Sequence, residues 1–228
     1  TKNINSIGKN STIYKNNPQS ELISAYNYNL SMPLGKKYKN SRNTLTPKVS
    51  FRFSPHDMKN HANTSRRINI DNIFSSNRLG LEDSFEVGES LTLGVDFVKE
   101  KINKINNEII EIEDYFDFKL ATVFRFEEEV NIPVNSTLNK KNSNIFGQLN
   151  FKPNKNILLD YNFSLNNDLN TFEYNSITSK LVFGNFSTEF NFLEERGAIG
   201  NSNLIENTLA YNFDEYNSLS FGTRRNRK

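Results

Sequence analysis

The chain has 228 residues with a mean hydropathy of −0.65, and 36% of its residues are hydrophobic. No segment approaches the roughly 20 consecutive apolar residues of a membrane-spanning helix, so the sequence excludes a helical membrane protein. The 28 basic and 26 acidic residues leave a formal net charge of +2, which lacks the strong basic excess typical of nucleic-acid-binding proteins. There is no cysteine, so the chain contains neither disulfides nor thiolate metal sites.

Apolar and polar residues alternate along almost the whole chain, and the helical period is nearly absent. Side chains of a strand point alternately to its two faces, so this period of two predicts strands with one apolar and one polar face. Several predicted strands approach the roughly 9–11 residues of a tilted membrane strand and exceed the ~5–6 residues usual in soluble proteins. In chain order, the predicted strands are residues 22–32, 48–53, 85–97, 116–126, 145–151, 157–165, 172–183, 186–192, 205–213 and 216–223.

Short and long connections alternate from the fifth predicted strand onward, as they do in outer-membrane barrels. The short ones contain Pro, Gly, Asn and Asp and comprise residues 153–156, 184–185 and 214–215. The long polar ones are residues 55–83, 127–143 and 194–203. This order places 55–83 and 127–143 outside the cell and 35–43 and 100–112 in the periplasm. Residues 101–112 either extend two strands into a hairpin or form a short helix.

Alternation alone is equally compatible with a soluble β-sandwich, whose apolar faces point inward. Three features favour a membrane barrel. Phe and Tyr make up 12% of the chain, often near strand ends; the opposite faces carry polar residues suited to a water-filled lumen; and strand follows strand without helices. We therefore predict an all-β fold, an antiparallel up-and-down transmembrane outer-membrane β-barrel of which about ten strands are present. Without a signal peptide at its start, and with basic residues at its end, the chain is expected to be one barrel domain, 1–228, truncated at both ends.

Charged residues and glycines are densest in residues 66–94. One interpretation is a solvated loop that runs into a strand. The other is a loop folded into the lumen and held by ion pairs of Arg78 with Asp83 or Glu86, because Arg–carboxylate hydrogen bonds are strong. In this second interpretation Gly88 and Gly94 lie on the luminal face and leave room for the loop.

The segment Asp71–Gly88 resembles the signature of the lipopolysaccharide-assembly family LptD. That signature has an acidic-Asn-Leu/Ile-Phe segment followed by Asn-Arg-x-x-Gly-x-Asp-Arg-x-Glu-x-Gly, and residues 71–74 and 77–88 are similar to its two parts. Residues 45–49, Leu-Thr-Pro-Lys-Val, are similar to a strand start of the family. One position departs from the signature, since Ser84 stands where the family commonly has Arg. An ion pair made by that Arg is therefore not expected here.

The resemblance implies an outer-membrane protein of a Gram-negative bacterium that takes lipopolysaccharide from the periplasm and inserts it into the outer leaflet. It also implies a longer parent protein, with an N-terminal periplasmic jellyroll that is absent here. The implied partners are lipopolysaccharide, an LptE-type lipoprotein plug and, through the jellyroll, the periplasmic lipopolysaccharide-transport bridge. The candidate loop anchors facing the lumen are Arg66, Arg67, Asp71, Asn77, Arg78, Gly80, Asp83, Glu86, Gly88 and Gly94. The alternatives are a generic porin or uptake barrel and a soluble secreted β-sandwich adhesin.

Sequence features of enzymes are weak. The run Glu127–Glu129 is typical of a solvated loop, and His56 and His61 lie with Asp57 in one polar stretch that lacks further fixed metal ligands. No Ser-His-Asp order, phosphate-binding loop or dinucleotide fingerprint is present. We expect no catalytic site, no metal and no cofactor.

Overall fold

The computed structural model describes residues 2–6, 19–105 and 108–227. The described part contains one short 3-10 helix, η1 (Val134–Ser136), and no helix in it is long and apolar enough to span a membrane. The strands are β1 (Lys2–Ser6), β2 (Gln19–Ile23), β3 (Tyr26–Ser31), β4 (Leu34–Lys37), β5 (Ser41–Ser54), β6 (Gly88–Ile105), β7 (Glu108–Arg125), β8 (Ile145–Asn154), β9 (Ile157–Leu165), β10 (Phe172–Phe183), β11 (Phe186–Glu195), β12 (Ser202–Asn212) and β13 (Ser218–Asn226).

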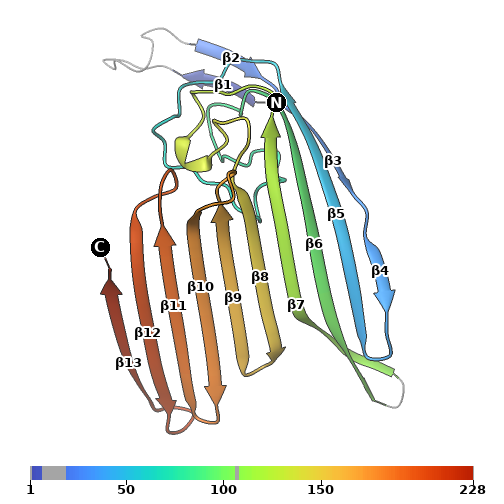
Figure 1. Ribbon diagram of the computed structural model, residues 1–228, viewed down its shortest axis with the longest axis vertical. Helices are drawn as coiled ribbons and strands as arrows, with labels where there is room; N and C mark the ends of the chain where they lie inside the picture. The colour runs from blue at the N-terminus through green and yellow to red at the C-terminus, as the bar shows by residue number, and fades with distance from the viewer. Residues whose placement is uncertain (1, 7–18, 106–107, 228) are drawn as a thin grey trace.

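Eleven strands form one antiparallel sheet in which sequence neighbours are also spatial neighbours, from β5 through to β13 (Figure 1). β1 and β2 form a separate two-stranded sheet. Strand β13 lies at one edge of the large sheet, and β3 with β4 forms the other edge, so the sheet is open. This order confirms the predicted all-β, up-and-down architecture of a partial barrel.

The predicted single strand over 22–32 is divided in the structure between β2, which ends at Ile23, and β3, which begins at Tyr26. Strands β3 and β4 form the edge of the large sheet. Both strands pair with β5, β3 opposite residues 48–53 and β4 opposite residues 42–45. The break between β3 and β4 includes Pro33, whose ring fixes φ and removes a backbone donor. Within the large sheet, β4 adds one strand to the ten that alternation predicts, and β1 in the small sheet is also not predicted. Strand β4 reduces the expected connection 35–43 to a turn, in which the Tyr38 N–H donates to the carbonyl of Ser41 at 2.7 Å.

In the segment 101–112, residues 101–105 and 108–112 are paired strands and not a helix. Strand β6 continues to Ile105, and β7 starts at Glu108, with residues 106–107 outside the described part. The backbone pairing runs on through Ile102 opposite Ile112, with register shifts nearby. Both strands are 18 residues long and are well over the predicted lengths, because their charged ends interrupt the alternation that marks a strand in sequence.

The register gives the sheet two contrasting faces. One row of directly opposed residues runs across four strands and consists of Tyr28, Phe51, Leu91 and Phe124. We call this side the apolar face; Tyr28 is 66% exposed and Phe51 is 40% exposed. A row on the other side, the polar face, crosses six strands and consists of Thr46, Asp96, Lys119, Gln148, Asn162 and Ser176.

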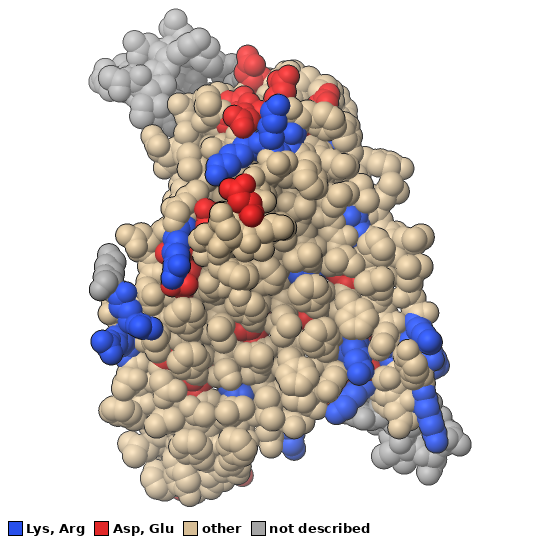
Figure 2. Space-filling view, viewed as in Figure 1, with Lys and Arg blue, Asp and Glu red and all other residues tan. Residues whose placement is uncertain are grey.

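Tight turns lie at one end of the sheet and longer connections at the other, which is the upper end in Figure 1. The longer connections are residues 55–87, 126–144, 166–171 and 196–201. The predicted alternation of short and long connections is therefore confirmed. Figure 2 shows that charged side chains gather over the upper end and along the margins, while much of the strand region in view is uncharged.

The connections 55–87 and 126–144 fold together against the polar face at the upper end, and we call this unit the cap. Its core joins loop residues to three strand residues, Ala121, Val123 and Phe146, which lie on the polar face. The buried loop residues are Met58, Ile68, Ile70, Ile73, Leu79, Leu81, Ile132 and Leu138. The main hydrophobic core of the molecule therefore lies between cap and sheet, because the apolar face itself stays exposed.

Candidate functional site

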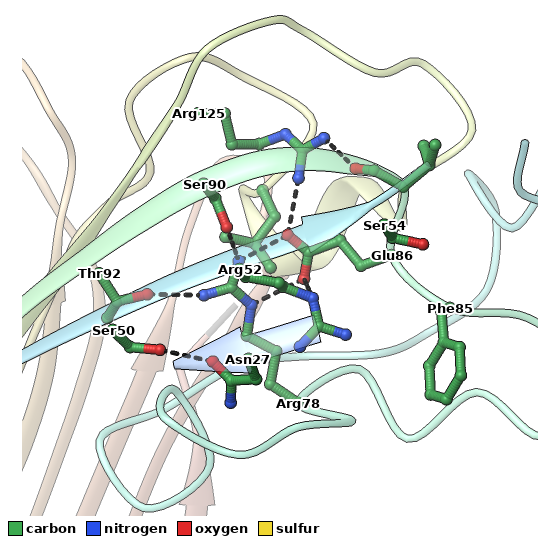
Figure 3. Close-up of polar contacts among 12 residues, drawn as sticks. Asn27, Ser50, Arg52, Ser54, Arg78, Phe85, Glu86, Ser90, Thr92 and Arg125 are labelled. Atoms are coloured by element: carbon green, nitrogen blue, oxygen red, sulfur yellow. Dashed lines mark hydrogen bonds and ion pairs between the residues drawn. The ribbon is translucent and has the colours of Figure 1, made fainter. Parts of the chain in front are cut away.

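The cap is joined to the sheet by a buried charged cluster centred on Glu86, which is 2% exposed (Figure 3). Glu86 lies at the end of the long connection, just before β6. Gly88 starts that strand with a φ of 82°, a left-handed conformation that favours glycine. A Cβ at Gly88 would lie 3.2 Å from Nη2 of Arg125, so the glycine also leaves space beside the cluster.

Arg78 binds Glu86 in a bidentate manner. Its Nε donates to Oε2 at 2.7 Å and its Nη2 donates to Oε1 at 2.5 Å. Its Nη1 donates to the Thr92 hydroxyl of β6 at 2.9 Å and to the carbonyl of Ile73 in the cap at 3.4 Å, and its Nη2 donates to the Ser90 hydroxyl of β6 at 3.0 Å. Arg78 belongs to the cap. Its side chain therefore joins the connection 55–87 both to Glu86, near the end of the same connection, and to β6, the strand that follows.

Two further arginines approach the same carboxylate from the sheet. Arg125, at the end of β7, donates from Nη1 to Oε1 of Glu86 at 2.6 Å and from Nη2 to the carbonyl of Val87 at 2.6 Å. Arg52, on β5, lies with its Nε 3.9 Å from Oε2 of Glu86. Within the described part of the chain, this buried Nε has no hydrogen-bond partner. The cluster thus links the cap to β5, β6 and β7.

Three guanidinium groups surround one carboxylate, so the cluster carries an excess of positive charge. Burial alone would raise the pKa of Glu86, but the charge of Arg78, its hydrogen bonds, and the charges of Arg52 and Arg125 outweigh burial and lower the pKa to about 2. The carboxylate is therefore ionised at neutral pH. Since a buried charge without a partner is costly, Glu86 is the residue on which the burial of all three arginines depends.

Of the two predicted partners of Arg78, the structure pairs it with Glu86 and not with Asp83. Asp83 lies instead 3.3 Å from Nζ of Lys59 and 3.1 Å from Nε2 of His61. Partial burial alone would raise the pKa of Asp83, but the charge of Lys59 and its hydrogen bond to the carboxylate contribute to lowering that pKa below its ordinary value. Asp83 therefore forms a second, more exposed connection within the cap.

Gly94 makes room for the cap on the polar face of β6. A Cβ at this position would lie 2.7 Å from Cζ of Phe74 and 3.1 Å from the Cβ of Ala121. Phe74 belongs to the cap and packs against its core. A side chain at residue 94 would therefore displace the Phe74 ring.

The other candidate residues lie around the cap but outside the cluster. Arg67 forms an ion pair with Glu195 of β11, and Asp71 lines a cavity between the cap and strands β8 to β10. Asn77 donates from Nδ2 to the carbonyl of Leu81 at 3.1 Å, and Gly80 turns with a φ of 61°. Arg66 is exposed and lies near Gly80 at the surface of the cap. Ser84, where the family signature has Arg, is buried, and its hydroxyl accepts a hydrogen bond from the backbone N–H of Lys59 at 3.4 Å.

Sequence reasoning missed Arg52 and Arg125. Both lie in predicted strands, and the alternation of Arg52 with Phe51 and Phe53 already places it on the polar face. Nothing in the sequence gives the register that brings the two strands to Glu86. In the structure, Arg52 pairs opposite Ser90 and Ser90 pairs opposite Arg125, and this register brings both arginines to Glu86.

Comparison with known families shows which family the chain belongs to. The model of the LptD family, described as LPS transport system D, matches residues 3–218. No curated protein matches the chain significantly. The family match covers nearly the whole chain, including all four residues of the Glu86 cluster.

Proposed function

Because the chain belongs to the LptD family of lipopolysaccharide transport proteins, we propose that it forms part of an outer-membrane barrel that takes lipopolysaccharide from the periplasm and inserts it into the outer leaflet. The observation that carries this proposal is the division of one sheet into an exposed apolar face and a continuous polar face. Lipid-facing and lumen-facing residues alternate in this way in transmembrane barrels.

In this assignment the apolar face contacts lipid tails and the polar face lines the lumen. Every backbone group in a membrane needs a partner, so the edges at β13 and β3–β4 require further strands in the assembled barrel. The polar face then offers hydrogen-bonding groups to sugars and phosphates, while acyl chains leave laterally into the membrane. The longer connections, and with them the cap, face the cell exterior, since outer-membrane barrels carry their longer loops there.

The role that we propose for the cap is to close this part of the lumen at its outer end. The Arg78–Glu86 pair anchors the cap at its centre, and the ion pair of Arg67 with Glu195 adds a second anchor to β11. A closed outer end suits a carrier of lipopolysaccharide better than a porin, because a porin needs an open aqueous path. A lipoprotein plug of the LptE type would bind the part of the polar face below the cap, and the periplasmic transport bridge would deliver the substrate.

Depletion of the full protein in its native host tests the transport function. We expect newly made lipopolysaccharide to accumulate before it reaches the cell surface, as measured by surface labelling and membrane fractionation. Normal surface lipopolysaccharide combined with slower uptake of small solutes would contradict the proposal and support the porin alternative.

A further inference from the structure

A cavity of about 310 Å³ lies between the cap and the polar face of β8, β9 and β10. Its volume is at the lower end of the roughly 300–1,000 Å³ typical of small-molecule sites. The segment 67–71 and Asn135 line it from the cap, and Ile199 lines it from the connection between β11 and β12. The sheet contributes Phe146, Gln148, Asp160, Asn162, Ser164 and Tyr174.

The sheet side of the cavity carries a set of hydrogen-bonding groups at fixed positions. Gln148 and Asn162 are directly opposite each other on neighbouring strands, and Tyr174 is opposite Ser164. Oε1 of Gln148 accepts from Nζ of Lys119 at 3.4 Å, and Asn162 donates to the carboxylate of Asp160. Amides and carboxylates held in this way bind vicinal hydroxyl groups, while the tyrosine ring and Phe146 offer apolar contact to the carbon skeleton of a small polar ligand.

The charges around the cavity disfavour an anion. Asp71 on the cap and Asp160 on the sheet both line the cavity, so it carries two carboxylates. Arg67 is the one cation among the lining residues, and it is already paired with Glu195. Lys119, which lies beside the cavity at Gln148, is paired with Asp117, with its Nζ 3.2 Å from Oδ2. A phosphate group would therefore meet two carboxylates, while both nearby cations already have acidic partners. An uncharged polyol avoids this repulsion and can donate its hydroxyl hydrogens to both carboxylates.

We propose that this cavity binds an uncharged sugar unit of the lipopolysaccharide, in contrast to its phosphorylated part. The proposal rests on the proposed function, since the ligand is a part of the transported molecule. The cavity lies at the junction of cap and lumen wall, so a bound sugar would contact both at once.

Photo-cross-linking in cells tests the site in the full protein. The photoreactive amino acid p-benzoylphenylalanine replaces Tyr174 in the cavity and, in a second strain, Ala210, which register places on the polar face away from the cavity. Each position is combined with the double substitution Gln148→Ala and Asp160→Asn. We expect the double substitution to lower the yield of lipopolysaccharide cross-linked at position 174 about five-fold, because two hydrogen-bonding partners are lost, and to leave the yield at position 210 unchanged.

A matched control is Asp168→Asn, which removes an exposed carboxylate from the connection 166–171 and should leave both yields unchanged. The variant Asp71→Asn, on the exposed surface of the cap, tests the same carboxylate pair without altering a strand. Cross-linking at position 174 that is insensitive to both Asp71→Asn and the double substitution would overturn the sugar site alone. Absence of lipopolysaccharide from both position 174 and position 210 would overturn the proposed transport route as well.

Discussion

At the scale of single residues, one carboxylate controls the burial of three arginines. Glu86 is surrounded by Arg78, Arg125 and Arg52, and all four side chains are at least nine-tenths buried. Replacing a buried ion-pair network with apolar groups can be neutral, whereas removal of one partner is strongly destabilising. Removal of Glu86 should be more destabilising than removal of one partner of a simple pair, since loss of the single acid leaves three cations without a counter-charge.

The variant Glu86→Gln should therefore release the cap from the sheet. We expect a loss of about 3–5 kcal/mol in the free energy that holds the cap, the range typical of a broken buried ion pair. Limited proteolysis of the connection 55–87 in the folded full protein measures this loss. The matched control is Glu82→Gln, an exposed acid in the same loop, which should cleave like the wild type. Equal protection of the Glu86→Gln and Glu82→Gln variants would refute the anchoring role.

The low pKa of Glu86 predicts how the cap responds to acid. The folded pKa of about 2 lies below the ordinary value of 4.5, so its stabilising effect is fully present above about pH 4.5 and is lost as pH falls toward 2. Proteolysis with an acid-active protease, or hydrogen exchange of the cap, should show protection at pH 5 that declines only below about pH 4.5. The Glu86→Gln variant should lack this decline. Protection that is already lost at pH 6 in the wild type would contradict the assignment.

Some contacts of the Glu86 cluster can be predicted from the sequence and others cannot. Arg78 and Glu86 lie eight residues apart in one loop, so their pairing is a local feature that can be expected from the sequence. Arg125 is 39 residues from Glu86 and reaches it only through the register of β6 and β7. Alternation fixes the face on which an arginine lies, but the position of that arginine along the strand depends on pairing that no local pattern contains.

At the scale of elements, the strands were predictable and the cap was not. Alternation identifies β5 to β13 because each strand has one face in an apolar environment. The cap core has no such period, since Ile68, Ile70 and Ile73 pack against Ile132 and Leu138 from a separate connection. Hydrophobic residues in an irregular loop look the same in sequence whether the loop is solvated or folded, so the two interpretations of residues 66–94 stay open until the structure places the cap on the sheet.

Gly94 links the strand and cap elements, and its substitution tests their packing. The variant Gly94→Val should force the ring of Phe74 away from β6, because a Cβ already approaches Cζ of Phe74 to 2.7 Å. We expect a loosened cap in a sheet that still forms, seen as faster proteolysis of residues 55–87 with normal barrel assembly. Gly222→Val is the control, since a Cβ there meets no atom closer than 3.7 Å. A Gly94→Val cap as resistant as that of Gly222→Val would contradict this contact.

At the scale of the whole molecule, the two faces of the sheet require different environments. The exposed aromatic and aliphatic side chains would be unfavourable in water, and in a lipid bilayer they are the expected surface of a barrel. The cap adds the main buried core, and the polar face below it remains lined by hydrophilic side chains. Family membership and the arrangement of the faces thus lead independently to the same architecture.

The most direct test compares two adjacent residues of β8 in the full protein. Leu149 lies on the apolar face opposite Phe118 and Tyr161, and Asn150 lies on the polar face opposite Asp117 and Asp160. Arginine on a lipid-facing strand position costs about 2–4 kcal/mol near the middle of the bilayer, whereas a lumen position tolerates it. Barrel assembly, measured by the heat-dependent shift in gel mobility, should fall sharply in Leu149→Arg and stay at the wild-type level in Asn150→Arg. Equal assembly of the two variants, or greater damage from Asn150→Arg, would contradict a lipid-facing apolar face.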